Sequence, residues 1–301
     1  MSDSVSPAPR HHAAFSDWLT GARPQTWPNA FSGVVLGSGA AAFHDGFNWW
    51  RALLALVVAW ALIIGVNFAN DYSDGIRGTD EDRTGPLRLT GSGLARPRHV
   101  KWAAFAAFGV AGLAGIVLSL ASAWWFIIIG ALCILGAWFY TGGKNPYGYR
   151  GLGEVAVFLF FGLVSVLGTE FTQRGAISWQ AVVAAVGVGA ISAAINLANN
   201  IRDIPSDAET GKITLAVRLG DANARRLFVV LVAVPFVASI ALAFATWPAL
   251  VPLLLLPLAV KAARPVYRGA TGSDLIPVIG ATGKTMLAWA VLTAIALALA
   301  Y

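Results

Sequence analysis

The chain has 301 residues, of which 57% are hydrophobic and only 12% are charged, a composition that excludes an ordinary water-soluble domain of this length. The formal net charge of +6 would suit a nucleic-acid partner, but the basic residues are dispersed among loops beside apolar runs, where membrane topology explains them better. We therefore expect an all-α, polytopic membrane protein that lies in a lipid bilayer and binds no nucleic acid.

Residues 1–20 open with a polar segment that includes Arg10 and the pair His11-His12 and lacks the apolar stretch of a secretory signal. We expect these residues to form a disordered cytoplasmic tail, followed by a single transmembrane domain over residues 21–301. The single cysteine, Cys133, lies within an apolar run. It excludes a disulfide framework and a cysteine-based metal site.

Long apolar runs continue through the rest of the chain. A membrane-spanning helix needs roughly 20 predominantly apolar residues, and runs of about that length predict nine transmembrane helices. In chain order, we expect these helices near residues 27–44, 50–70, 101–119, 123–141, 154–173, 178–199, 226–246, 248–264 and 276–300.

The positions of Lys and Arg predict the orientation of these helices. With the N-terminus in the cytoplasm, almost every Lys and Arg falls on that side, and only Arg51 and Arg174 fall on the other. The two long polar connections, residues 71–100 and 200–225, fall on the cytoplasmic side as well. Because function concentrates in long polar loops on rigid scaffolds, we expect an active site that faces the cytoplasm.

Two similar polar motifs follow long apolar runs. The first is Asn67–Asp74 (NFANDYSD), and its near copy is Asn196–Asp203 (NLANNIRD). On a helix, residues at i, i+3, i+4 and i+7 share one face, and the Asn and Asp residues of both motifs follow that spacing. Two polar faces at the ends of two apolar helices predict one shared site.

Most acidic residues of the chain gather in these motifs and in the connections that follow them, including Asp80, Asp207 and Glu209. Like charges packed at a membrane surface repel one another unless a cation binds between them. Mg²⁺ suits this arrangement, because it takes a few carboxylates and keeps its other positions for water and substrate phosphates. The alternative is that the acids only solvate the ends of the loops or pair with neighbouring Arg.

The paired motifs, Asn70-Asp71-x-x-Asp74 with Asp80 and Asp203-x-x-x-Asp207, resemble those of the UbiA-type intramembrane prenyltransferases. Further segments are similar to the branch of that superfamily that prenylates 1,4-dihydroxy-2-naphthoate: Ala22–Trp27, Tyr140–Lys144, Gly151–Glu154 and Gly211–Gly220. The resemblance covers residues 20–220. It implies nine helices around a central chamber open to the lipid, and transfer of a polyprenyl group from polyprenyl diphosphate to the naphthoate with loss of its carboxylate.

The same resemblance implies roles for individual residues. Two Mg²⁺ ions would be held, directly or through water, by Asp71, Asp74, Asp203 and Asp207, with Asp80 as a further ligand or a later base. Asn67, Asn70, Asn196 and Asn200 would act as co-ligands or orient the substrates. The remaining substrate-binding candidates are Tyr140 and Lys144 of a YxxxK element assigned to the diphosphate, Arg23, Arg150 and Lys212 as further cations, Glu154 for the aromatic acceptor, and Lys284.

Structural explanations compete with some of these roles. A Lys near a helix end, such as Lys144, is often a topology residue whose charge reaches back to the interface, and Glu154 would also suit the positive end of a helix dipole. Lys284 lies in the last apolar run, where an ionisable group is functional by default.

Other functions remain open at this point. Within the superfamily, the acceptor could instead be 4-hydroxybenzoate, homogentisate or haem. An ion-coupled transporter is a more remote alternative, because it would place ionisable groups near the middle of the membrane, whereas here nearly all of them fall near one surface.

Overall fold

A computed structural model of the chain describes residues 12–78 and 87–300, which form helices and connecting turns with no β-strand. The longer helices are α2 (Pro28–Phe43), α3 (Trp49–Gly75), α4 (Pro97–Ala121), α5 (Phe126–Phe139), α8 (Trp179–Arg202), α10 (Leu215–Leu242), α11 (Leu256–Tyr267) and α12 (Ile276–Ala298). The shorter ones are α1 (Phe15–Gly21), α6 (Gly153–Val157), α7 (Ser165–Arg174) and α9 (Ile204–Glu209).

Three segments of other helical geometry continue four of these helices. A π-helical segment, Phe158–Val164, joins α6 to α7 without a break. The turns Trp247–Leu255 and Gly272–Leu275 are 3₁₀-helical and lead into α11 and α12.

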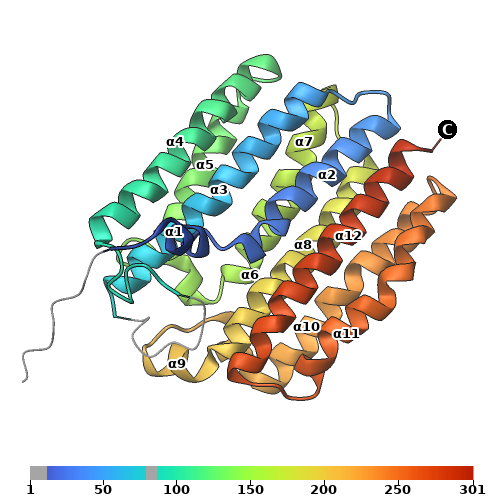
Figure 1. Cartoon of the computed structure of the whole chain (residues 1–301). Helices are drawn as coiled ribbons and strands as arrows, with labels where there is room; N and C mark the ends of the chain where they lie inside the picture. The colour runs from blue at the N-terminus through green and yellow to red at the C-terminus, as the bar shows by residue number, and fades with distance from the viewer. Residues whose placement is uncertain (1–11, 79–86, 301) are drawn as a thin grey trace, which may run out of the picture.

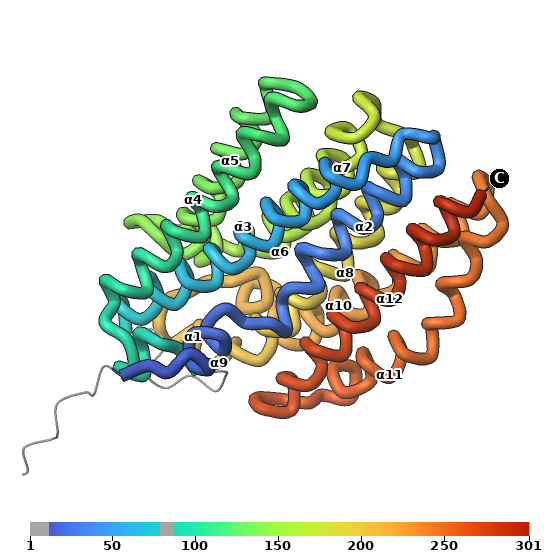
Figure 2. Tube along the Cα trace, turned by 45° about the horizontal axis from the view of Figure 1, so that its top comes forward, coloured from blue at the N-terminus to red at the C-terminus, as the bar shows by residue number. Residues whose placement is uncertain are grey.

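The long helices run side by side as one bundle (Figure 1). Both views place α4 and α5 at one edge and α11 at the opposite edge (Figure 2). Helix α8 is the most enclosed of the long helices. Its most apolar 18-residue stretch is 78% buried, whereas the corresponding stretches of the other long apolar segments are 28–50% buried. The core therefore centres on α8, and the second polar motif stands at the end of this central helix.

The described residues contain seven helical segments that are long and apolar enough to cross a membrane. Each predicted run coincides with a helical segment, but α2 and α5 have only 16 and 14 residues. These lengths correspond to about 24 and about 21 Å, less than the roughly 30 Å of a hydrocarbon core. An all-α membrane protein is confirmed, whereas nine crossings remain a prediction.

The disordered tail predicted for residues 1–20 needs correction at its end, because residues 15–20 belong to α1. The Asp17 carboxylate accepts a hydrogen bond from the Ala14 amide at 2.8 Å, which caps the first turn. The Trp18 ring meets the Phe68 ring of α3 edge to face, with 5.7 Å between centroids. This contact holds α1 against the end of the bundle.

Side chains and prolines fix where the long helices begin. The Asn48 side chain caps α3 by accepting a hydrogen bond from the Arg51 amide at 3.2 Å. The Ser178 side chain caps α8 by accepting one from the Ala181 amide, also at 3.2 Å. Pro97 stands in the first turn of α4, where its missing N–H costs no hydrogen bond. These local signals start the apolar helices at defined residues, so the polar motifs fall at their far ends.

The π-helical segment packs against α8 through glycines. A Cβ on Gly162 would lie 2.6 Å from the Gly189 Cα atom and 2.8 Å from the Ala185 carbonyl oxygen. Both of these are backbone atoms, so the two helices would have to separate to admit a side chain.

We predict that Gly162→Leu destabilises the folded protein by about 1–3 kcal/mol or more, because it overpacks this backbone contact. Gly109→Leu is the matched control, since no described heavy atom lies within 4 Å of a Cβ at that exposed position. Thermal unfolding in detergent measures both. Equal melting temperatures for the two variants would contradict the close contact between the π-helical segment and α8.

Candidate active site

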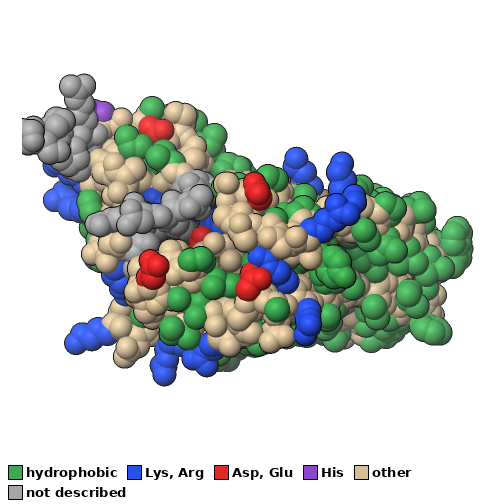
Figure 3. Space-filling view, turned by 90° about the horizontal axis from the view of Figure 1, so that it is seen from below, with side chains coloured by type: hydrophobic (Ala, Val, Ile, Leu, Met, Phe, Trp, Pro, Cys, Tyr) green, Lys and Arg blue, Asp and Glu red, His purple; other side chains and the backbone are tan. Residues whose placement is uncertain are grey.

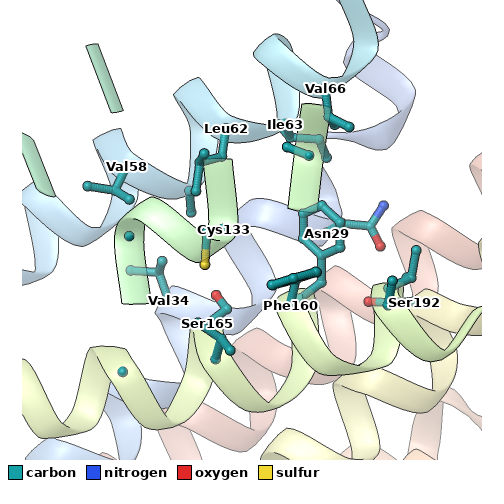
Figure 4. Close-up of a pocket in the computed structure, with 18 of the residues that line it drawn as sticks. Asn29, Val34, Val58, Leu62, Ile63, Val66, Cys133, Phe160, Ser165 and Ser192 are labelled. Carbon is teal, nitrogen blue, oxygen red and sulfur yellow. The ribbon is translucent and has the colours of Figure 1, made fainter. Parts of the chain in front are cut away.

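The two Asn/Asp motifs border one cavity of about 280 Å³. Asn67 and Asn70 reach it from α3, and Asn196 and Asn199 reach it from α8. Away from these amides, most of the lining is apolar and comes from α2 to α8. Figure 4 shows part of this wall, with Cys133 of α5 pointing across the cavity toward Ser165.

The cavity is elongated along the helices. The α3 residues that line it run from Asn70 to Ala55, which is about 22 Å along the helix axis at the usual rise per residue. One end therefore carries amide groups and neighbouring ionic residues, and the remainder is suited to a long apolar group. That combination fits an amphiphilic substrate with a polar head and a hydrocarbon tail.

Asp71 is fully buried and holds a loop. Its two carboxylate oxygens accept hydrogen bonds from the backbone amides of Leu89 and Thr90, both at 2.8 Å. The side chain is not part of the cavity wall. Asp71 therefore positions the last part of the connection between α3 and α4, at Leu89 and Thr90 next to Arg88.

Asp74 lies one turn further along α3 and faces a different loop. Its carboxylate accepts a hydrogen bond from the Tyr149 hydroxyl at 2.7 Å and lies 3.6 Å from the Arg88 guanidinium. Only 5% of Asp74 is exposed. The cation and the hydrogen-bond donor compensate for the hydration that this buried carboxylate loses.

The acidic residues of the second motif are paired in the same way. Arg202 donates two hydrogen bonds to Asp203, at 2.7 and 2.8 Å, and both side chains are buried. The Lys212 ammonium lies 3.1 Å from Asp207 and 5.6 Å from the centroid of the Tyr149 ring. Tyr149 thus contacts Asp74 of the first motif and Lys212 beside the second.

A separate network surrounds Glu154 at the start of α6. One of its oxygens accepts hydrogen bonds from Asn196 at 3.2 Å and from Asn200 at 2.6 Å. Asn196 in turn accepts the Tyr140 hydroxyl at 3.2 Å. The second Glu154 oxygen, Oε2, is buried and has no hydrogen-bond partner among the described residues. Such an acceptor is costly to leave unpaired and suits a donor group of a ligand.

Tyr147 contributes a neutral hydroxyl to the cavity wall. It donates a hydrogen bond to a backbone carbonyl of α5 at 2.7 Å, and burial, with a smaller contribution from the nearby Cys133, raises its pKa to about 12. The hydroxyl therefore remains protonated throughout the physiological range.

The remaining Asn residues of the first motif fix neighbouring loops. Asn67 donates hydrogen bonds to the Ala22 carbonyl at 3.1 Å and to the Thr26 hydroxyl at 3.0 Å. Asn70 accepts the Thr141 hydroxyl at 2.8 Å. Both amides still border the cavity, so they join its wall to the segments that close its polar end.

Arg23 stands between α1 and α2 with a left-handed backbone, φ 52°, which is uncommon for a residue other than glycine. It borders the cavity and also an adjacent smaller pocket that is lined by Arg88, Arg202, Thr26 and Asn199 as well. Three guanidinium groups thus border one small pocket, and two of them are also paired with Asp74 and Asp203.

Several predicted site residues do not line the cavity. Lys144 and Arg150 are exposed on the loop between α5 and α6, and Lys284 is exposed in the third turn of α12. Asp80 lies outside the described residues. For Lys284 the exposed position means that its ionisable group is not enclosed among the helices, contrary to what its place in an apolar run suggested.

The sequence did not identify some residues at the polar end of the cavity as site residues. It indicated them only as positive charges that set the membrane topology. Arg77 donates hydrogen bonds to the carbonyls of Thr141 and Gly143, and its guanidinium lies 5.4 Å from the Tyr149 ring centroid. Arg88 and Arg202 line the small pocket beside Arg23. Their position in the polar connections was the available signal, but it did not distinguish them from surface cations.

The acidic side chains of the polar end fit Mg²⁺ only if water and substrate phosphates supply some of its ligands. Among the described residues, no group of three or more His, Cys, Asp and Glu side chains converges on one point. Mg²⁺ is often bound through one or two carboxylates, with water and substrate phosphates completing its coordination. Asp74, Asp203 and Asp207 fit that use better than Asp71, because their charged partners are side chains, whereas Asp71 is bound to backbone amides.

Comparison with known sequences and structures gives a consistent result. The model of the UbiA prenyltransferase family matches residues 30–279. The 1,4-dihydroxy-2-naphthoate octaprenyltransferase of Mycobacterium tuberculosis is 56% identical over 286 residues, 95% of this chain and 98% of that protein. The Escherichia coli protein of the same name is 41% identical over 216 residues, 69% of this chain and 70% of that protein.

Solved structures share the fold at low identity. A UbiA homolog from Aeropyrum pernix K1 superposes with a TM-score of 0.68 at 18% identity, covering 87% of this chain and 96% of that one. A UbiA homolog from Archaeoglobus fulgidus, bound to GPP and Mg²⁺, gives a TM-score of 0.64 at 13% identity, with 94% and 99% covered.

We predict that Asp71→Asn speeds hydrogen exchange of the Leu89 and Thr90 amides by tenfold or more. A hydrogen bond to a charged group contributes about 1.5–3 kcal/mol, and the substitution removes the charge and one of the two acceptor oxygens. Exchange detected by mass spectrometry over the segment 87–95 measures this effect. Asp221→Asn, at a half-exposed carboxylate, is the control. Unchanged exchange in Asp71→Asn would show that the loop is held in another way.

Proposed function

Because this chain belongs to the UbiA prenyltransferase family, we propose that it transfers a polyprenyl group from polyprenyl diphosphate to 1,4-dihydroxy-2-naphthoate. The direct product is the quinol form of a demethylmenaquinone, which a later two-electron oxidation converts to the quinone, and the acceptor carboxylate leaves as CO₂. The mycobacterial relative supports this acceptor through 56% identity over nearly the whole of both chains. The observation that carries the proposal is the elongated apolar cavity that ends at buried carboxylates and guanidinium groups.

The donor fits this cavity with its hydrocarbon tail between the helices and its diphosphate at the polar end. Arg23, Arg88 and Arg202 would bind phosphate oxygens there, and Lys212 stands beside Asp207 at the same end. As the allylic C–O bond breaks, negative charge grows on the departing diphosphate, and fixed cations stabilise it most at that moment. The pocket thus favours ionisation of the donor rather than only its binding.

Mg²⁺ is the metal we assign to this end, as two ions held through Asp74, Asp203 and Asp207, and it supplies Lewis-acid stabilisation of the leaving diphosphate. Asp71 supports the site by fixing the loop that carries Arg88. In support, two structures of the Archaeoglobus homolog contain Mg²⁺, one together with GPP and one with DMAPP.

The acceptor is assigned to the neighbourhood of Tyr140, Asn196 and Glu154. The buried Glu154 Oε2 would accept a hydrogen bond from an acceptor hydroxyl and so raise the electron density of the ring. The ring carbon that bears the carboxylate attacks the allylic cation and forms the new C–C bond. Loss of CO₂ then returns the electron pair of the broken C–C bond to the ring, which restores aromaticity without an oxidant.

We also propose that the polar end faces the cytoplasm. Lys and Arg side chains, with some acidic ones, gather on the face seen from below in Figure 3. Arg51 and Arg174 lie near the opposite ends of the helices, at the start of α3 and the end of α7. The positive-inside rule assigns the more basic end to the cytoplasm. An ion-coupled transporter finds no support here, because the family is one of prenyltransferases.

The acceptor assignment is tested with purified protein, Mg²⁺ and a labelled polyprenyl diphosphate. We expect 1,4-dihydroxy-2-naphthoate to react with a kcat/KM at least tenfold above 4-hydroxybenzoate and homogentisate, with release of the carboxyl carbon and loss of turnover in EDTA. A Glu154→Gln variant should lower kcat, because its neutral amide is a weaker acceptor for the hydroxyl proton. Preference for 4-hydroxybenzoate, or carboxyl carbon retained in the product, would overturn the assignment.

Orientation is tested with single cysteines in a Cys133→Ala protein. The two variants are Ile177→Cys and Thr210→Cys. Position 177 lies between α7 and α8, position 210 lies between α9 and α10, and both are exposed. A membrane-impermeant maleimide added to intact cells should label position 177 and leave position 210 unlabelled until the membrane is opened. Labelling of position 210 alone would reverse the proposed orientation. Labelling of both positions from outside would contradict the proposal that they lie on opposite sides of the membrane.

A further inference from the structure

Asn29, in the first turn of α2, borders the cavity with an amide oxygen that lacks a partner (Figure 4). Only 7% of the residue is exposed. Its side-chain nitrogen donates a hydrogen bond to the Thr26 carbonyl at 3.0 Å, and because a carbonyl only accepts, this bond fixes which end of the amide is the oxygen. That oxygen, Oδ1, is buried and has no hydrogen-bond partner among residues 12–78 and 87–300. An unpaired buried acceptor suits a hydrogen-bond donor on a ligand.

The contacts of Asn29 place it near the polar end of the cavity. Thr26, whose carbonyl it binds, also accepts a hydrogen bond from Asn67 through its hydroxyl at 3.0 Å. Asn29 is therefore joined through one short turn to the first Asn/Asp motif. Gly33, one turn further along α2, already lies at the level of the π-helical segment, because a Cβ there would be 3.1 Å from the Phe161 carbonyl oxygen.

Asn29 and Asn196 lie on neighbouring walls of the cavity. A Cβ on Gly283 of α12 would lie 3.7 Å from a side-chain carbon of Pro28 and 3.9 Å from one of Ile195. These two residues directly precede the two asparagines, and both asparagines border the cavity. The start of α2 therefore faces the same region as the end of α8 that carries the second motif.

Two buried oxygens without partners thus lie around the region assigned to the aromatic acceptor. Glu154 Oε2 is one, on the side of α6 and α8, and Asn29 Oδ1 is the other, on the side of α2. The chemistry of the substrates decides what can pair with them. An ionised diphosphate or carboxylate offers only acceptor oxygens, and the polyprenyl tail offers no polar group. The hydrogen-bond donors of the substrates are the two hydroxyls of the aromatic acceptor.

The two hydroxyls of 1,4-dihydroxy-2-naphthoate have different chemical uses. The 1-hydroxyl is next to the carbon that bears the carboxylate, so its oxygen gives electron density directly to the carbon that attacks. The 4-hydroxyl is meta to that carbon and does not activate it by resonance. Its use is therefore in orientation, because a fixed acceptor for its proton holds the ring at one angle to the allylic carbon.

We propose that Asn29 is a specificity-determining residue that accepts a hydrogen bond from the 4-hydroxyl through Oδ1, while Glu154 accepts one from the 1-hydroxyl. The site then recognises acceptors with two hydroxyls para to each other. An acceptor with a single hydroxyl, such as 4-hydroxybenzoate, leaves one buried oxygen unpaired and is disfavoured for that reason. The inference rests on the proposed function, because the occupant of the site is the aromatic acceptor.

The first test combines a substitution in the protein with the removal of one hydroxyl from the substrate. Wild type, Asn29→Ala and Ser32→Ala are each assayed with 1,4-dihydroxy-2-naphthoate and with 1-hydroxy-2-naphthoate, which lacks the 4-hydroxyl. The quantity compared is the ratio of the two kcat/KM values, because the intrinsic reactivity of each compound cancels between variants. Ser32 is the matched control, since its hydroxyl is buried on the same helix without a partner in the described chain but does not border the cavity.

We expect this ratio to fall about tenfold in Asn29→Ala and to stay within about twofold of the wild type in Ser32→Ala. An unchanged ratio in Asn29→Ala would overturn the inference, since a side chain that only supports the fold affects both compounds alike. Absence of turnover with 1,4-dihydroxy-2-naphthoate in the wild type would instead contradict the proposed function.

A second test needs no substitution and so does not depend on how Asn29→Ala folds. Naphthalene-1,4-diol, 1-naphthol and 4-methoxy-1-naphthol are compared, without oxygen, as inhibitors of the wild type in competition with 1,4-dihydroxy-2-naphthoate. The diol should bind about tenfold more tightly than the other two compounds, because both lack the donor at position 4. Equal inhibition constants for the diol and the methoxy compound would overturn the inference.

Discussion

Charge compensation below the surface of the bundle is the constraint on which the polar end depends. An ionised carboxylate removed from water is tolerated only when cations and hydrogen-bond donors replace its hydration. Asp74 meets that condition with Arg88 and Tyr149, and Asp203 meets it with Arg202. Because these partners come from loops as well as helices, the loops cannot move independently of α3 and α8. The rigid polar end is therefore a consequence of burying charge.

The loop between α5 and α6 joins the two halves of this end. Its Tyr149 contacts Asp74 of the first motif and lies under the Lys212 ammonium beside the second, while Arg77 binds the loop carbonyls. The same residues that stabilise the loop also present cations to any diphosphate bound there. Removing a partner would leave a buried charge uncompensated, so these contacts contribute to the stability of the polar end.

The apolar part of the molecule follows a different principle. Without a hydrophobic driving force between helices in lipid, close packing of small residues holds them together, as at Gly162 against Gly189 and Gly39 against Ala294. Those contacts make α2, α8, α12 and the π-helical segment a firm wall. Helix α5 has no comparable contact along the middle of its inner face.

The sequence by itself determined the fold class, the approximate extent of the apolar helices and the presence of two polar motifs at helix ends, because each depends on local composition and helical spacing. Its motifs also indicated the family correctly. The tertiary structure decided which motif residues face the cavity: Asn70 does, whereas Asp71 turns to the amides of Leu89 and Thr90. It also decided that Lys144 and Lys284 point outward. These outcomes depend on contacts between segments far apart in the chain, and on how helices rotate as they pack, neither of which the spacing of residues encodes.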